Sequence, residues 1–209
     1  INVSRILRII WQQKNGISRI EIAKKLNLDK STITNIVSNL LDRGLVKEMV
    51  EGNSSPQGGR KPIYLAINKD FGCVGGIEIQ PTYYSVVVID LNGNKLISVI
   101  KKCKISSDNL LNTLPVIIDN IIEKAAIKKH NLIGIGIAFS GILNPEKGAI
   151  MQSIPLQIKA PLNICALLNE KYDIPIYIEN DANCCAWAEL TFQKSLNLKN
   201  FIFVLIEMR

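Results

Sequence analysis

Three short segments near the start of the chain repeat apolar residues at helical spacing, and only brief turns separate them. The first segment runs from Val3 to Trp11 and ends before Asn15-Gly16. A capping box, Ser18-x-x-Glu21, opens the second, and Asn27-Leu28-Asp29 separates it from a third helix that stops at Gly44. Two short helices joined by a three-residue turn predict a helix-turn-helix.

The outward face of the third helix carries short hydrogen-bonding side chains and one lysine, at its start. These residues are Lys30, Ser31, Thr32, Thr34, Asn35 and Ser38. A helix that enters the major groove needs such side chains for base edges and phosphates, whereas a solvated face more often carries Glu and Lys pairs. We predict that they bind DNA together with Ser18 and Arg19. The alternative is a structural three-helix unit, because this geometry also occurs without DNA.

After Gly44 the apolar period changes to that of strands. Leu45–Val50 and Ile63–Ile67 are strand-like and enclose a polar loop, Glu51–Pro62. The glycines of this loop let the backbone lie close to a partner, and Arg60 and Lys61 supply positive charge. A wing that places Arg60 at the minor groove fits this pattern, and a solvated loop is the alternative. Residues 1–70 are predicted to form a winged helix-turn-helix domain.

The charge distribution favours the same interpretation. Residues 1–70 hold 12 Lys and Arg against 6 Asp and Glu, whereas residues 71–209 hold 13 against 12. Almost all of the net charge of +7 therefore lies in the first third, which suggests a polyanionic partner. The five cysteines form no C-x-x-C motif, and Arg5 and Arg8 interrupt the N-terminal apolar stretch. We expect a cytoplasmic protein with no membrane partner.

The remaining residues, 71–209, alternate strand-like and helix-like segments and predict an α/β sheet domain. Strands are expected at Val74–Gln80, Ser85–Asp90, Lys95–Lys104, Leu132–Phe139, Ile174–Glu179 and Phe201–Glu207, and helices at about 108–129, 162–172 and 182–192. Asn92-Gly93 is a hairpin turn signal. Ligands of such sheets meet the carboxyl ends of strands, so the loops after Phe139 and Glu179 are the places to look.

The loop after Glu179 places a carboxylate between two carboxamides. Asp181 can accept the hydrogen bond or the proton of a sugar hydroxyl, and Asn180 and Asn183 offer paired donors and acceptors. The alternative is an aspartate that merely caps the following helix. Ser140-Gly141, after the other strand, is a second and weaker candidate. No residue pattern indicates a metal site.

Taken together, these residues resemble the ROK family of repressors and sugar kinases. Four segments look like its repressor branch: Ile17–Ala23, Leu28–Thr32, Leu40–Val46 and Gly58–Pro62. The helix-turn-helix and the wing are most similar to those of xylose repressors. Glu179–Asn183 looks like the family's sugar loop, with Asp181 in the position of the kinase catalytic base. The resemblance implies a sugar-kinase-like second domain of the actin/Hsp70 (ribonuclease H-like) fold, in which Ser140, Gly141, Asn180 and Asp181 bind a sugar.

Two departures from the family pattern change what the resemblance implies. The kinases carry Asp-x-Gly-Gly-Thr to hold ATP phosphates and Mg²⁺. The corresponding stretch here is Gly76-Ile77-Glu78-Ile79-Gln80-Pro81-Thr82, in which a longer Glu78 displaces the carboxylate and the Gly-Gly-Thr cradle is absent. In addition, the family's Glu-x-Gly-His motif, its zinc site and its second lobe have no counterpart up to residue 209. We expect only the first lobe of the effector domain, no cofactor within this chain, and no enzymatic activity.

The sequence therefore predicts a sequence-specific repressor of carbohydrate-utilisation genes that a sugar, xylose or another monosaccharide, releases from DNA. The expected partners are a palindromic double-stranded operator, bound by a homodimer, and the sugar. One alternative is a kinase that phosphorylates a hexose and carries an appended DNA-binding head. Another is a protein that binds DNA constitutively because its degenerate sugar domain has no effector.

Overall fold

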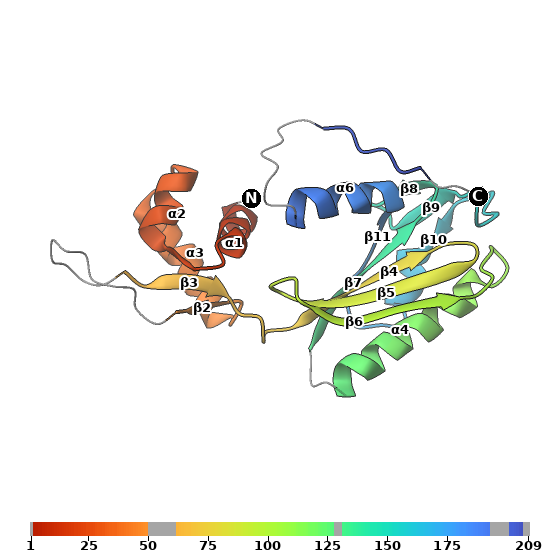
Figure 1. Cartoon of the computed structure of the whole chain (residues 1–209), viewed down its shortest axis with the longest axis horizontal. Helices are drawn as coiled ribbons and strands as arrows, with labels where there is room; N and C mark the ends of the chain where they lie inside the picture. The colour runs from red at the N-terminus through yellow and green to blue at the C-terminus, as the bar shows by residue number, and fades with distance from the viewer. Residues whose placement is uncertain (1, 50–61, 128–130, 193–200, 207–209) are drawn as a thin grey trace. The chain divides into compact units, whose positions relative to one another are not determined.

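A computed structural model describes residues 2–49, 62–127, 131–192 and 201–206. The chain divides into two compact units (Figure 1). The N-terminal unit comprises Ile1–Phe71 and Asp90–Asn94, and the C-terminal unit comprises Gly72–Ile89 and Lys95–Arg209. Each unit has its own cluster of buried apolar side chains, so each is described by itself.

The N-terminal unit is a winged helix-turn-helix. Its elements are α1 (Asn2–Gln12), β1 (Ile17–Ser18), α2 (Arg19–Leu26), α3 (Lys30–Asp42), β2 (Val46–Glu48) and β3 (Tyr64–Ile67). The strands form an antiparallel sheet in the order β1-β3-β2. Ile6, Ile33 and Leu65 are fully buried where the helices meet this sheet. The predicted helices are confirmed, and the predicted wing loop lies mostly outside the described residues.

The turn between α2 and α3 follows from two local signals. Ser18 caps α2, and its hydroxyl and backbone amide exchange hydrogen bonds with Glu21, as the capping box predicts. At the other end Asn27 takes a left-handed conformation with φ of 51°, and its N–H closes the helix. Asparagine tolerates this conformation, so the chain reverses within three residues and α3 begins at Lys30.

The N-terminal unit also includes the turn between β5 (Tyr83–Asp90) and β6 (Lys95–Lys102). Asp90 Oδ1 accepts the backbone N–H groups of Asn92 and Asn94, each at 2.9 Å, and Gly93 has φ of 84°. The Asn92-Gly93 turn signal is thereby confirmed. Trp11 Nε1 donates a hydrogen bond of 2.8 Å to the carbonyl oxygen of Leu91, at the tip of this turn.

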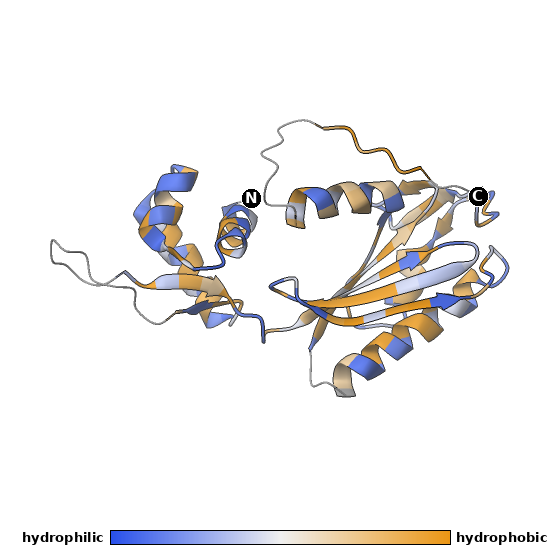
Figure 2. Ribbon diagram, viewed as in Figure 1, coloured by the Kyte–Doolittle hydropathy of each residue, from blue (hydrophilic) through white to orange (hydrophobic). Residues whose placement is uncertain are grey.

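The C-terminal unit is built on a five-stranded sheet in the order β11-β7-β4-β5-β6. Its remaining elements are β4 (Cys73–Ile79), α4 (Leu110–Ile127), β7 (Leu132–Phe139), β8 (Ile142–Asn144), β9 (Ala149–Gln152), β10 (Leu162–Asn163), α5 (Ile164–Asn169), β11 (Ile176–Asn180) and α6 (Asp181–Phe192). α4 covers one face of the sheet and α6 lies on the other (Figure 1). The central strands are mainly hydrophobic in Figure 2, as expected for a sheet covered on both faces.

Two sequence expectations for this unit need correction. The sequence predicts a strand at Phe201–Glu207, but its described residues, 201–206, are irregular, and Ile202 and Ile206 are 92% and 81% exposed. An apolar run forms a strand only when a neighbouring strand pairs with it, and no described strand does so here. The polar loop after Ser140 contains β8, which pairs with β9, and β9 also pairs with β10 to complete a small second sheet.

Candidate functional site

The α3 helix presents the predicted DNA-binding side chains on one exposed face. The opposite face buries Ile33, Val37 and Leu40, so helical periodicity alone determines which residues point outward. Five of the six predicted residues of α3 are exposed and Thr32 is half-buried; the five are Lys30, Ser31, Thr34, Asn35 and Ser38. The structure therefore leaves short polar side chains accessible to a partner along three turns of the helix.

The start of α3 offers groups that suit a polyanion. Asp29, the N-cap residue, makes no side-chain cap hydrogen bond, so the first backbone N–H groups of α3 have no carboxylate over them. Lys30 is exposed, so its positive charge lies at an accessible start of the helix. Thr34 Oγ1 donates to the carbonyl oxygen of Lys30 at 2.8 Å. These features match what a phosphate backbone needs from a helix N-terminus.

Ser18 and Arg19, which were also predicted to bind DNA, have structural partners. Ser18 is only 8% exposed, and its hydroxyl donates to Glu21 Oε2 at 2.7 Å. The backbone N–H and then the hydroxyl of Ser18 hold the pKa of Glu21 below its usual range. Arg19 forms an ion pair of 3.0 Å with Glu48 on β2. Arg60 and Lys61 lie outside the described residues, so their DNA contacts stay predictions.

In the C-terminal unit, three parallel strands end at one edge of the sheet. β7 lies between β4 and β11, and Phe139 at its end is opposite Ile79 of β4 and Asn180 of β11. The residues that follow these strand ends are brought together, as the carboxyl ends of parallel strands require. We call this cluster the strand-end site, and it consists of Gln80, Ser140, Gly141, Asn180 and Asp181.

Gly141 and Asn180 connect two of the three strand ends. Asn180 Nδ2 donates to the carbonyl oxygen of Gly141 at 3.0 Å, and Ser153 Oγ donates to that of Ser140 at 2.6 Å. Gly141 has φ of 143°, and a Cβ there would collide with the backbone of Gln152 and Ser153. Only glycine fits this close approach, so the loop that follows β7 is held in one shape.

The helix-capping alternative for Asp181 holds in part. Asp181 Oδ1 accepts the N–H of Ala182 at 2.9 Å, but Asn180 Oδ1 accepts both this N–H and that of Asn183, at 2.9 and 3.2 Å. Asn180 therefore does most of the capping of α6. The second oxygen of Asp181, Oδ2, accepts from Gln80 Nε2 at 3.4 Å, across 101 residues of sequence.

Sequence reasoning missed Gln80 as a site residue. The sequence places Gln80 at the end of a strand and within the departure from the kinase motif, and neither feature assigns it to the site. The sequence offers a polar residue at the end of a predicted strand, but its burial, with only 3% of its surface exposed, emerges only in the structure. Glu78, two residues earlier, accepts hydrogen bonds from the Tyr83 and Ser85 hydroxyls at 3.0 and 2.9 Å.

The electrostatics at the start of α6 oppose further negative charge. Burial, and then the nearby Glu179 carboxylate, raise the pKa of the Cys184 thiol to about 11, so it is protonated at neutral pH.

Within the described residues there is no group of three or more His, Cys, Asp or Glu side chains that could hold a metal ion. No helix in that part of the chain is long and apolar enough to cross a membrane.

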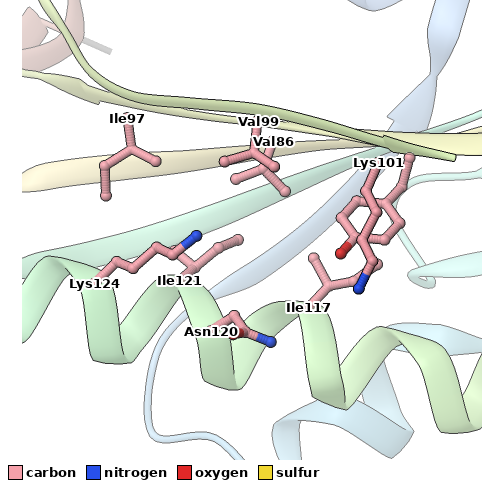
Figure 3. Close-up of a pocket in the computed structure, with 9 residues that line it drawn as sticks. Val86, Ile97, Val99, Lys101, Ile117, Asn120, Ile121 and Lys124 are labelled. Atoms are coloured by element: carbon pink, nitrogen blue, oxygen red, sulfur yellow. The ribbon is translucent and has the colours of Figure 1, made fainter.

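A separate cavity of about 160 Å³ lies between α4 and strands β5 and β6 (Figure 3). Its walls are mainly aliphatic, and polar groups come from four residues: Tyr84, Lys101, Asn120 and Lys124. No residue of the strand-end site lines this cavity. The candidate sugar site is therefore distinct from it and rests on the strand ends.

Comparison with known proteins decides the family. A model of the ROK family matches residues 74–208, nearly all of the C-terminal unit. The chain belongs to the ROK family. A model of the MarR family matches residues 4–49, which span α1 to β2. The predicted family is thereby confirmed, and a helix-turn-helix that matches the MarR family precedes the ROK segment.

Two curated relatives are named as xylose repressors and are about twice the length of this chain. The xylose repressor of Caldicellulosiruptor bescii is 30% identical over 98% of this chain and 51% of its own. That of Staphylococcus xylosus is 33% identical over 96% and 51%, respectively. This chain thus spans about half the length of the curated relatives that it matches.

Solved structures confirm the fold. A ROK family transcriptional regulator, a homolog of the Escherichia coli MLC protein, matches 92% of this chain and 48% of its own, with a TM-score of 0.76 and 26% identity. A Listeria monocytogenes protein assigned as an N-acetylmannosamine kinase matches 60% of this chain and 41% of its own, with a TM-score of 0.50 and 24% identity. The second match shows a shared fold and nothing more.

Proposed function

We propose that the protein is a transcriptional repressor that binds DNA through its N-terminal unit and releases it when a monosaccharide binds the strand-end site. One observation carries this proposal. The same ROK chain combines a helix with an exposed row of short polar side chains and a sugar-kinase-like fold that keeps Asp181 at a strand end. The first feature suits reading of base edges, and the second suits recognition of hydroxyl groups.

The DNA partner that best fits is a palindromic operator bound by two copies of the protein. A single α3 helix covers only a few base pairs, so specificity in a genome requires a second reading helix. The relatives named as repressors support this role. A DNA-binding role supports a cytoplasmic location for the protein.

The effector that best fits is a small sugar, with xylose as the first candidate because two relatives carry that name. Asp181 and the amide of Asn180 would bind hydroxyl groups, while Ser140 and Gly141 would form the facing wall. A sugar that binds more tightly to the conformation with low operator affinity shifts the population toward that conformation. No catalytic step is needed for this response.

A kinase activity is the less favoured alternative. The residues at the place of the family's phosphate motif include no Gly-Gly pair, and the Glu78 carboxylate is already bonded to Tyr83 and Ser85. A phosphoryl-transfer site must cradle the phosphates and their metal ion, and we propose that this chain does not. Hexose-dependent release of ADP by the full-length protein would restore the kinase interpretation.

The effector part of the proposal is tested by the substitution Asp181→Asn in the full-length protein. It keeps the size of the side chain and removes its charge, so operator affinity without sugar should be unchanged while release by D-xylose or D-glucose is lost. Operator binding is followed by fluorescence anisotropy during a sugar titration. Asp173→Asn, an exposed aspartate of the same unit, is the matched control and should respond normally. A normal response of Asp181→Asn would contradict the assignment.

A further inference from the structure

Three buried or half-buried polar side chains meet beside the end of β4. Gln80 Nε2 lies 3.4 Å from Glu78 Oε1 and 3.4 Å from Asp181 Oδ2. Gln80 is 3% exposed and Asp181 is 7% exposed, so water has little access to this bridge. A neutral amide nitrogen thus lies between two carboxylates, one on β4 and one at the start of α6.

The chemistry of a carboxamide suits this place. Its –NH₂ group has two N–H donors, and an ionised carboxylate is purely an acceptor. One donor can therefore serve each carboxylate, which offsets the repulsion between two like charges held close together. A carboxylate in the place of Gln80 would add a third negative charge, and an aliphatic side chain would leave both carboxylates without this donor.

The bridge is anchored at its β4 end. The Glu78 carboxylate accepts from Tyr83 and Ser85, one hydrogen bond on each oxygen, and both donors come from β5. Glu78 therefore has a fixed orientation, and Gln80 extends from this fixed group to Asp181. At the other end, Asp181 has one bond on each oxygen: Oδ1 accepts from Ala182 and Oδ2 from Gln80.

These contacts decide how Asp181 is presented. The terminal torsion of an aspartate is broad, so a carboxylate held by one hydrogen bond can still rotate. The second bond, from Gln80, removes that freedom before a ligand arrives, and a site ordered in advance binds more tightly. We propose that Gln80 is a positioning residue of the effector site, which aligns the Asp181 carboxylate for a sugar hydroxyl and occupies the place between Glu78 and Asp181 that a cation would otherwise favour.

This inference rests on the proposed function in so far as Asp181 binds the effector. Its test uses different variants from the test of the proposed function. The unsubstituted full-length protein is compared with Gln80→Met and Gln80→Glu. Methionine has nearly the volume of glutamine but no N–H donor, so it keeps the packing around position 80 and removes only the bridge. Glutamate has the shape of glutamine and adds a carboxylate. Gln152→Met, at an exposed position of β9, is the matched control.

Two readouts are measured on each variant. The first is the concentration of D-xylose or D-glucose that releases the operator: we expect it to rise about 10-fold for Gln80→Met, and further for Gln80→Glu, because a hydrogen bond to a charged group is lost. Operator affinity without sugar should not change, which separates positioning from misfolding. The second is the thermal midpoint in CaCl₂, which should rise by about 2–4 °C for Gln80→Glu alone, since three carboxylates then converge.

The outcomes are separable. If the unsubstituted protein responds to neither sugar, the effector proposal has failed for both sugars, and the Ca²⁺ readout on Gln80→Glu still tests the bridge. If it responds and Gln80→Met responds at the same sugar concentration, the positioning role is overturned. Absence of Ca²⁺ stabilisation in Gln80→Glu would show that residues 78, 80 and 181 do not converge, and would overturn the bridge.

Discussion

The two units hold their candidate functional side chains in opposite ways. In the N-terminal unit, Ser31, Asn35 and Ser38 project from one face of a single helix, and within the described part of the chain no side-chain hydrogen bond joins them to other residues. In the C-terminal unit, Gln80 and Asp181 come from different strand ends and are bonded to each other. The side chains on α3 are exposed and accessible to a partner, whereas those of the strand-end site already form a hydrogen-bonded network.

This difference predicts how substitutions should act. A change on the exposed face of α3 removes contacts with a partner and leaves the fold alone, because the buried face carries the packing. A change in the strand-end site alters bonds that also hold loops together. Binding and stability should therefore separate in the N-terminal unit and change together in the C-terminal unit.

The largest expected effect is on DNA binding. Asn35→Ala should lower the affinity for the preferred operator by about 10- to 100-fold, because a side chain that pairs with a base edge contributes about 1–3 kcal/mol of discrimination. The thermal midpoint should stay the same. Electrophoretic mobility shifts measure the affinity, and Asn112→Ala, at an exposed position of α4, is the matched control. Equal affinity for Asn35→Ala would mean that α3 is not the reading helix.

The next effect is on stability in the C-terminal unit. Gly141→Ala should lower the free energy of unfolding by about 1–3 kcal/mol, because an alanine is strained at this φ and its Cβ meets the backbone of Gln152. Gly136→Ala on β7 is the matched control, since a Cβ there meets nothing within 4 Å. Chemical denaturation measures both. Equal losses of stability in the two variants would contradict the close approach of Gly141 to the backbone of Gln152.

A smaller loss is expected where the N-terminal unit depends on a helix cap. Ser18→Ala should lower its free energy of unfolding by about 1 kcal/mol, because the hydroxyl no longer caps α2. Ser38→Ala, at an exposed position of α3, should leave stability within about 0.5 kcal/mol of the unsubstituted protein. The pair also tests whether Ser18 acts through the fold: a normal stability of Ser18→Ala, with weaker DNA binding, would contradict the structural role.

The smallest effect is a pH dependence in the same cap. Because Ser18 lowers the pKa of Glu21 in the folded state, the ionised carboxylate stabilises the fold above its usual value of 4.5, and this stabilisation is lost as the pH falls through the lowered pKa. The Glu21→Gln variant has no carboxylate at this position, so its stability has no such pH dependence. Between about pH 6 and about pH 3 the unsubstituted protein should therefore lose more stability than Glu21→Gln, as measured by urea denaturation. Parallel curves would refute the assignment.

The same contrast explains which features were predictable from the sequence. The helices of the N-terminal unit follow from local signals, such as the capping box at Ser18 and the spacing of Ile33, Val37 and Leu40. The strand-end loops that hold Gly141 and Asp181 followed from the alternation of strands and helices. Gln80 did not, because only the pairing of β4 with β7 brings it to Asp181. Phe201–Ile206 looked like a strand because its residues are apolar, and sequence alone does not show whether a partner strand exists.

The central claim is that this chain reads DNA as a sequence-specific repressor, and the most direct test is selection of bound sequences from a random duplex pool at moderate salt. We predict that residues 1–209 enrich an inverted repeat, because two copies of α3 would read two half-sites. Salt-sensitive binding without any enriched sequence would contradict the claim and reduce the basic N-terminal unit to a general polyanion-binding surface.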